Sequence, residues 1–87
     1  MERTDFTVTD PIGLHARPAA EVVKTAARHQ ARVRLELGGK TADARSIVQL
    51  LGLGVRQGSV VTVTAEGADE AEALAAVLEV LQRGAAA

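Results

Sequence analysis

One short segment combines residue types that could handle a phosphoryl group. It covers residues 13–19 and reads Gly13-Leu14-His15-Ala16-Arg17-Pro18-Ala19. A neutral imidazole such as that of His15 has a nucleophilic nitrogen, and the guanidinium of Arg17 carries a planar fork of donors that matches phosphate oxygens. Because Pro18 is favoured in the first turn of a helix, the segment predicts a helix that begins immediately after His15.

A histidine at the start of a helix is well placed to accept phosphate. The first backbone N–H groups of a helix lack intrahelical partners, and the macrodipole adds partial positive charge there. This environment favours a neutral, nucleophilic imidazole before transfer and binds the anionic phosphoryl group after it. We therefore expect His15 to be the phosphoryl acceptor, with the side chain of Arg17 and the backbone amides of Ala16 and Arg17 stabilising the phosphate.

A purely structural interpretation of the same residues stays open on physical grounds. In it, His15 only caps a helix, Arg17 is a solvated surface charge and Pro18 only starts the helix. The small neighbours suit the functional interpretation, because Gly13 allows a tight turn that leaves the imidazole exposed. Ala20, one turn further along, would let a partner protein approach closely.

The composition excludes several other kinds of chemistry. The 87 residues include no cysteine and only 2 histidines, which rules out disulfides and thiolate sites and argues against a multi-histidine metal site. Aromatic residues make up 1% and the net charge is −1, so nucleic-acid binding is not expected. No nucleotide-binding glycine loop, signal segment or bilayer-length apolar run occurs. We expect a single cytoplasmic domain over residues 1–87, without a cofactor, a metal or membrane insertion.

The order of elements follows from alternation and helical periodicity. Strands are expected at residues 3–9, 31–37, 40–43 and 60–66, and helices at residues 16–28, 46–51 and, between an Asp69 cap and a Gly84 stop, 70–83. The Gly38-Gly39 pair predicts a two-residue hairpin turn. The βαββαβα order predicts an α+β fold, an open-faced two-layer sandwich in which three helices cover one face of a four-stranded, mostly antiparallel sheet.

Apolar stripes predict which face of each long helix is buried. In the first helix the stripe consists of Ala16, Ala20, Val23 and Ala27. In the last helix it consists of Ala71, Leu74, Val77, Leu78 and Leu81. The short middle helix begins with Ser46 as its N-cap, and Gln49 three residues later completes a capping-box pattern.

A basic middle region and an apolar short helix predict a docking surface. Residues 15–56 carry eight basic and three acidic side chains, a charge that could steer an acidic partner. Ile47 and Leu50 are expected in the core, which leaves Val48 and Leu51 partly exposed near Leu53. Burial of all these apolar residues in the core is the open alternative. The candidate docking residues are Ala20, Lys24, Ile47, Val48, Gln49 and Leu51.

Residues 13–19 resemble the active-site motif of HPr, the histidine-containing phosphocarrier family of the bacterial phosphoenolpyruvate-dependent sugar phosphotransferase system. The resemblance extends over essentially the whole chain, including the Gly38-Gly39-Lys40 turn and the Gly67-Ala68-Asp69-Glu70 segment. It implies that His15 accepts, at Nδ1, a phosphoryl group that originates from phosphoenolpyruvate and arrives from enzyme I. His15 would pass it to EIIA components of sugar permeases. We expect a monomeric, stoichiometric carrier rather than an enzyme.

The segment Arg45-Ser46-Ile47 resembles the regulatory serine region of the same family. This implies phosphorylation of Ser46 by an HPr kinase/phosphorylase in carbon catabolite repression, with a catabolite-control regulator as a further partner. A phosphate there would suit the helix N-terminus, whereas its charge would weaken docking to an acidic enzyme I surface. A capping role alone for Ser46 stays open. A nitrogen-regulatory phosphorelay paralogue and a passive binding module are the alternative functions.

Overall fold

The computed structural model describes residues 1–83 and shows the predicted α+β fold. Its elements in chain order are β1 (Glu2–Thr7), α1 (Ala16–Ala27), β2 (Arg32–Leu37), β3 (Lys40–Asp43), α2 (Ile47–Gly52), β4 (Val60–Glu66) and α3 (Glu70–Arg83). The βαββαβα order is confirmed, the bounds of β3, β4 and α3 are as predicted, and those of the other elements differ by one or two residues. The expected stop at Gly84 lies outside the described residues.

The four strands form one antiparallel sheet in the order β1-β4-β2-β3. β2 and β3 are joined by the predicted two-residue turn, in which Gly38 and Gly39 have φ angles of +56° and +85°. Both angles lie in the left-handed region, which glycine adopts without steric cost. The hairpin therefore follows directly from the glycine pair.

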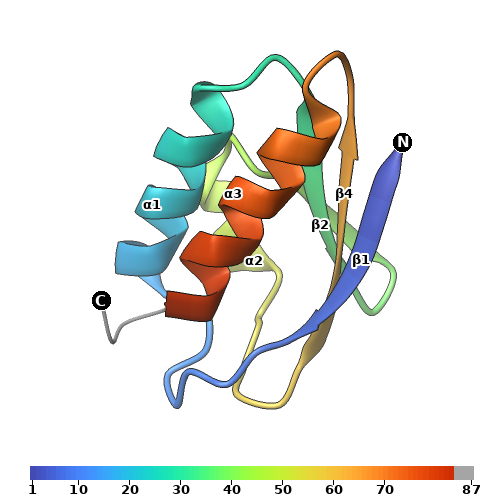
Figure 1. Cartoon of the computed structure of the whole chain (residues 1–87). Coiled ribbons are helices and arrows are strands. Elements are labelled where there is room, and N and C mark those ends of the chain that lie inside the picture. Colours follow the sequence, from blue (N-terminus) through green and yellow to red (C-terminus); the bar gives the residue numbers. More distant parts are fainter. Residues whose placement is uncertain (84–87) are drawn as a thin grey trace.

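The sheet has one covered face and one open face. All three helices lie on the same side of it (Figure 1). In β4, Val61 and Val63 are buried towards the helices, whereas the alternate residues Thr62 and Thr64 are partly exposed on the other face. Cross-strand pairing of Leu35 with Val63 extends the apolar layer into β2. The predicted two-layer, open-faced sandwich is confirmed.

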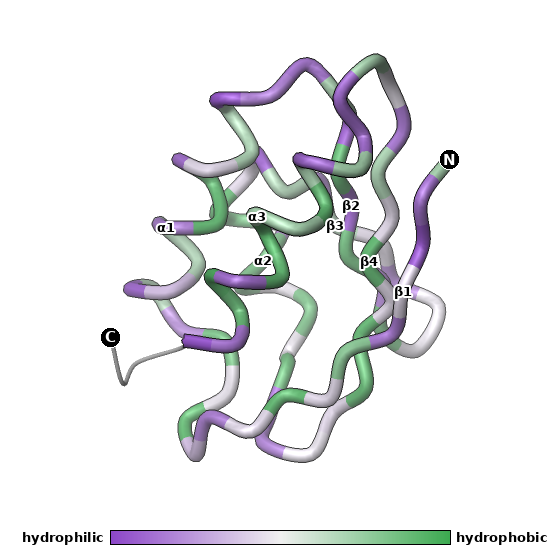
Figure 2. Tube along the Cα trace, in the orientation of Figure 1, coloured by the Kyte–Doolittle hydropathy of each residue, from purple (hydrophilic) through white to green (hydrophobic). Residues whose placement is uncertain are grey.

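The buried face of α1 differs from the predicted one. The buried residues of α1 are Pro18, Ala19, Val22, Thr25 and Ala26. Ala16 and Ala27 are exposed, and Ala20 and Val23 are half-buried. The helix carries small apolar residues on two faces, so periodicity could not show which face is buried. In the folded protein the face that contains Val22 packs against the core. In Figure 2, the side of α1 that faces away from the rest of the fold is mostly hydrophilic, and the side that faces α3 and the sheet is mostly hydrophobic.

The stripe predicted for α3 is correct at three of its five positions. Leu74, Val77 and Leu81 are buried, whereas Ala71 is exposed and Leu78 is half-buried. Ala73 and Val80 complete the buried face instead. The burial of Leu81 at the end of α3 brings this helix close to the loop that precedes α1, where Leu81 lines a small cavity together with Pro18.

Asp69 stands at the predicted N-cap position of α3, where its backbone carbonyl accepts from the Ala73 amide at 2.9 Å, but its side chain bonds outside the helix. Its carboxylate accepts hydrogen bonds from the backbone amides of Ala31 at 2.7 Å and Gln30 at 3.1 Å. These bonds lower the pKa of Asp69 below its ordinary value, and the bond from the Ala31 amide has the largest effect. The carboxylate therefore ties the start of α3 to the segment that enters β2.

Residues 1–83 contain no helix with both the length and the apolar character needed to cross a lipid bilayer.

Candidate functional site

His15 occupies the N-cap position of α1, at the end of a tightly held loop. Its backbone is extended, with φ −122° and ψ −176°, and its side chain makes no capping hydrogen bond. Two backbone bonds fix the loop before it: Gly13 donates to the Asp10 carbonyl at 2.9 Å, and Leu14 donates to the Val55 carbonyl at 3.2 Å. The imidazole is therefore carried by a segment that is anchored to the loop before β4.

The first turn of α1 presents two unused backbone donors. Pro18 has no N–H group, and the Ala19 amide donates to the His15 carbonyl at 2.9 Å. Within residues 1–83, no acceptor is hydrogen-bonded to the amides of Ala16 or Arg17. Two N–H groups thus remain available beside the imidazole, at the positive end of the helix dipole.

The two nitrogens of the His15 ring have different surroundings. Nε2 is shielded from solvent, has no hydrogen-bond partner among residues 1–83 and lies 3.9 Å from Oδ2 of Asp10. The side chain as a whole is 28% exposed, so the accessible part of the ring lies away from Nε2. Of the two ring nitrogens, only Nε2 is both shielded and without a hydrogen-bond partner, which leaves Nδ1 as the nitrogen for a molecule arriving from solvent.

Arg17 is exposed and unengaged in the part of the chain that the structure describes. Its guanidinium forms no ion pair or hydrogen bond with residues 1–83. It stands in the first turn of α1, two residues after His15. An anion bound at the imidazole could therefore be contacted by a guanidinium on the same turn that makes no polar bond to residues 1–83.

Ser46 is the N-cap of α2, as predicted. Its Oγ accepts a hydrogen bond from the Gln49 amide at 3.2 Å. The reciprocal half of the predicted capping box is wrong, because the side chain of Gln49 does not return to Ser46. Its Oε1 accepts from the Asp43 amide at 2.8 Å, while the Ser46 amide donates to the Asp43 carbonyl. The end of β3 therefore supplies the acceptor that the capping box would have supplied.

The outer side of α2 exposes three apolar side chains. Val48 is 78%, Leu51 41% and Ile47 37% exposed, and Leu50 is fully buried. The expectation that Ile47 points into the core is wrong, because so short a helix buries one large residue and Leu50 fills that place. Leu53, expected beside the patch, is also buried.

The three further candidate docking residues lie on α2 itself or on α1, the helix that packs against it. α1 packs against α2 and carries the half-buried Ala20 and the exposed Lys24. The Lys24 ammonium lies 3.8 Å from the Glu21 carboxylate, an exposed pair that is easily broken. Gln49 is exposed on α2. Helices α1 and α2 thus bring the candidate docking residues onto adjoining elements.

Sequence reasoning missed two residues of the loop before His15. Ile12 is 65% exposed, and its position between Pro11 and Gly13 could have indicated this, because a turn offers an apolar side chain no core face. Asp10 was assigned only to the turn, and its Oδ1 does accept from the Ile12 amide at 2.9 Å. Its approach to Nε2 of His15 had no signal in the sequence.

A metal centre finds no ligands at this site. Within residues 1–83, nowhere do three or more His, Cys, Asp or Glu side chains gather as metal ligands would. The groups gathered at this site are one imidazole, two backbone amides, one guanidinium and the carboxylate of Asp10.

Known proteins of one family are similar to this chain over most of its length. The family model described as "PTS HPr component phosphorylation site" matches residues 2–83. The structure of HPr-C-His from Thermoanaerobacter tengcongensis is 38% identical, with a TM-score of 0.89 over 95% of this chain and 93% of that chain. The phosphocarrier protein HPr from Bacillus anthracis is 39% identical, with a TM-score of 0.85 over 91% and 94% of the two chains. Crh, a Bacillus subtilis catabolite repression protein described as a domain-swapped dimer, is 40% identical, with a TM-score of 0.77 over 97% of each chain.

Proposed function

Since the chain belongs to the HPr family of phosphotransferase-system phosphocarriers, we propose that it carries a phosphoryl group on His15 between two partner proteins. The donor is enzyme I, which takes the group from phosphoenolpyruvate, and the acceptors are EIIA components of sugar permeases. The carrier acts in the cytoplasm as a stoichiometric substrate of its partners, and no catalytic turnover of its own is involved.

One observation carries this proposal: the imidazole of His15 stands beside two unpaired amides with one nitrogen accessible. The amides of Ala16 and Arg17 have no acceptor among residues 1–83, and the shielded nitrogen of the ring is Nε2. A phosphoryl group on Nδ1 would place its oxygens at the N-terminus of α1, where backbone donors and the helix dipole bind anions.

The transfer needs little more than positioning and charge stabilisation. The lone pair of His15 Nδ1 attacks the phosphorus, and the bond between the phosphorus and the donor breaks. The three phosphoryl oxygens then accept hydrogen bonds from the amides of Ala16 and Arg17 and from the guanidinium of Arg17. The P–N bond that forms has a good leaving group, so the next partner can remove the phosphoryl group.

The exposed apolar residues of α2 supply the surface on which both partners dock. Ile47, Val48 and Leu51 are exposed on a helix that packs against α1, the helix that begins at His15. Apolar patches with a polar rim are typical of protein interfaces. We assign Ala20, Lys24 and Gln49 to the rim of this docking surface.

Ser46 is the regulatory residue in this proposal. Its hydroxyl is an N-cap, and a phosphate attached there would keep a favourable place at the start of α2. The added negative charge would lie beside Ile47 and Val48 and would oppose an acidic partner. An HPr kinase/phosphorylase is the enzyme expected to act on it, and a catabolite-control regulator is the expected reader.

Phosphorylation by enzyme I and phosphoenolpyruvate tests the central claim. Wild type should acquire one acid-labile phosphate, seen by mass spectrometry and by phosphorus NMR. His15→Ala should acquire none, whereas His29→Ala, which removes the other histidine, should be phosphorylated as wild type is. Labelling that persists in His15→Ala, or no labelling of wild type, would refute the assignment.

A further inference from the structure

We propose that Asp10 is a positioning residue for phosphoryl transfer. Its carboxylate holds the proton of the neutral His15 ring on Nε2, which leaves the lone pair on Nδ1, and it offsets the positive charge that the ring gains when Nδ1 is phosphorylated. The inference rests on the proposed function, and it assigns a role to the loop before α1 that the motif of residues 13–19 does not contain.

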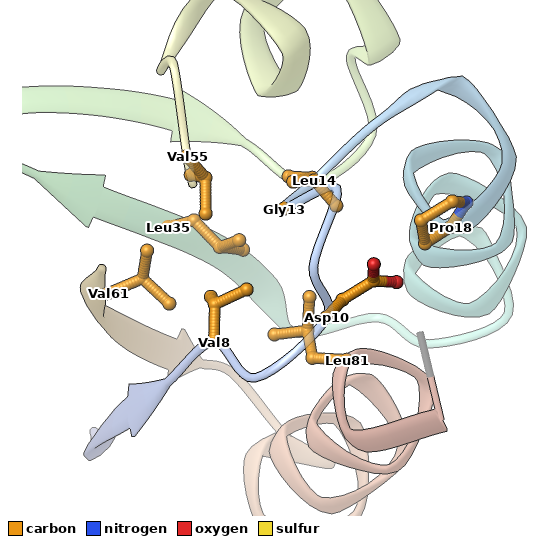
Figure 3. Close-up of a pocket in the computed structure, with 9 residues that line it drawn as sticks. All are labelled: Val8, Asp10, Gly13, Leu14, Pro18, Leu35, Val55, Val61 and Leu81. Atoms are coloured by element: carbon orange, nitrogen blue, oxygen red, sulfur yellow. The ribbon is translucent and has the colours of Figure 1, made fainter. Parts of the chain in front are cut away.

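The carboxylate of Asp10 is held in place independently of the histidine. Its Oδ1 accepts from the Ile12 amide at 2.9 Å, and its backbone carbonyl accepts from the Gly13 amide at 2.9 Å. The side chain is only 9% exposed. In Figure 3 the carboxylate points towards Pro18 in the first turn of α1, with Leu81 of α3 below it. Oδ2 is thereby presented to the N-terminal turn of α1.

The shielded Nε2 of His15 requires a charge of this sign near it. A buried ring N–H without an acceptor is costly, and among residues 1–83 the carboxylate oxygen near it is Oδ2 of Asp10, at 3.9 Å. That separation is longer than a hydrogen bond, but a charge at this distance is weakly screened in a shielded place. The opposite tautomer would turn the lone pair of Nε2 towards the carboxylate, which is repulsive. The geometry therefore favours the proton on Nε2.

The charge balance of the transfer explains why a carboxylate helps. Before transfer, the ring is neutral, with hydrogen on Nε2 and the lone pair on Nδ1. When Nδ1 bonds to phosphorus and the donor bond breaks, the hydrogen stays on Nε2 and the ring becomes a cation. When the phosphoryl group leaves, the electron pair of the P–N bond returns to Nδ1 and the ring is neutral again. No proton has to enter or leave at any step.

The N-terminus of α1 stabilises only half of this product. The amides of Ala16 and Arg17 favour the phosphoryl anion, but the same positive end of the helix disfavours a cationic ring. Asp10 supplies negative charge on the side of the ring that faces away from the phosphoryl group. The phosphoryl anion thus lies at the positive end of α1, and the cationic ring lies beside the negative carboxylate of Asp10.

Nitrogen NMR of the unphosphorylated protein tests the first half of the proposal. In wild type with a neutral His15, the ring shifts should show hydrogen on Nε2. Asp10→Asn keeps an oxygen for the Ile12 amide but removes the charge, and it should raise the share of the Nδ1-protonated form. Glu36→Gln, an equal charge change on the open face of the sheet, should leave the ring shifts unchanged. Hydrogen on Nδ1 in wild type would overturn the proposal, and this result does not depend on how the variant folds.

The phosphoryl equilibrium with enzyme I tests the second half. Asp10→Asn should shift that equilibrium towards phosphorylated enzyme I by about tenfold, as expected for one charge pair near 4 Å in a partly exposed place. Glu36→Gln should keep the wild-type equilibrium constant. A folded Asp10→Asn protein with unchanged ring shifts, or with an unchanged equilibrium constant, would overturn the role of Asp10. Absence of phosphorylation in wild type would instead refute the proposed function, so the two failures are distinguishable.

Discussion

Gly13 lies directly against the backbone of Val55. A side chain at position 13 would place its Cβ on the Val55 carbonyl oxygen and 2.7 Å from the Cα of Arg56. The φ angle of Gly13 is +82°, a conformation that other residues rarely adopt. This close approach lets the amide of Leu14 reach the Val55 carbonyl, and it sets the position from which His15 enters α1.

Gly13→Ala should destabilise the fold by about 2–4 kcal/mol, because backbone strain and overpacking add. Gly54→Ala is the matched control, since Gly54 also has a positive φ of +71° but no atom within 4 Å of its would-be Cβ. Gly54→Ala should lower the free energy of unfolding only through backbone strain, by about 1–2 kcal/mol. Urea unfolding of both variants measures the difference, and equal losses would show that the contact with Val55 is unimportant.

Arg17→Ala should slow phosphoryl transfer from enzyme I by about 10–100-fold, the effect of losing hydrogen bonds worth about 1.5–3 kcal/mol to a charged group. The free energy of unfolding should change little, because the Arg17 side chain forms no ion pair with residues 1–83. Quenched-flow transfer assays give the rate. Arg28→Ala, at the other end of α1, serves as the control and should transfer normally; a normal rate in Arg17→Ala would remove its proposed role.

Ser46→Ala should destabilise the protein by about 1 kcal/mol, because the Gln49 amide loses its capping acceptor. Ser46→Asp and Ser46→Asn both keep an acceptor and should retain most of the stability. Only Ser46→Asp adds negative charge, so it alone should weaken binding to enzyme I in calorimetric titrations. Equal affinities of the Asp and Asn variants would contradict an electrostatic effect of phosphorylation at this position.

Val48→Glu should raise the KM of enzyme I for this protein by about tenfold, since it places a charge in the centre of the proposed docking surface. Its unfolding free energy should change by less than about 0.5 kcal/mol, because Val48 is 78% exposed. Val60→Glu makes the same exchange at a residue that is 52% exposed on β4. If both variants raise the KM equally, the patch on α2 is not the specific interface.

Asp69 should make the fold sensitive to acid. Its pKa is lowered in the folded state, so the unfolded chain binds its proton at a higher pH. The stabilisation is therefore complete above about pH 4, the ordinary range of an aspartate, and is lost as the pH falls through the folded value. Asp69→Asn should be less stable than wild type at neutral pH, and the gap should narrow in acid. Urea unfolding over a pH series tests this, and a gap that stays constant with pH would show that Asp69 is not the titrating group.

Elements governed by local chemistry were predictable. The Gly38-Gly39 hairpin, the alternation in β4 and the Ser46 cap each depend on residues close in sequence, and each was confirmed. Predictions that depended on choosing between similar local patterns failed. Two faces of α1 carry small apolar residues, and the side chain of Gln49 accepts from the Asp43 amide rather than from the Ser46 amide that the capping box predicts. Only the packed neighbours decide such choices.

The sequence by itself determined the order of elements and the placement of His15 and Arg17 at the start of α1, because both depend on residues that are neighbours along the chain. The tertiary structure alone decided which atoms meet from distant segments. Asp69 reaches the amide of Ala31, and Leu14 reaches the carbonyl of Val55, across about 40 residues each. The turn at Asp10 was predictable, but the approach of its carboxylate to Nε2 was not. The direction of a side chain such as that of Asp10 is set by the residues packed around it. Those residues come together only when the helices have packed against the sheet.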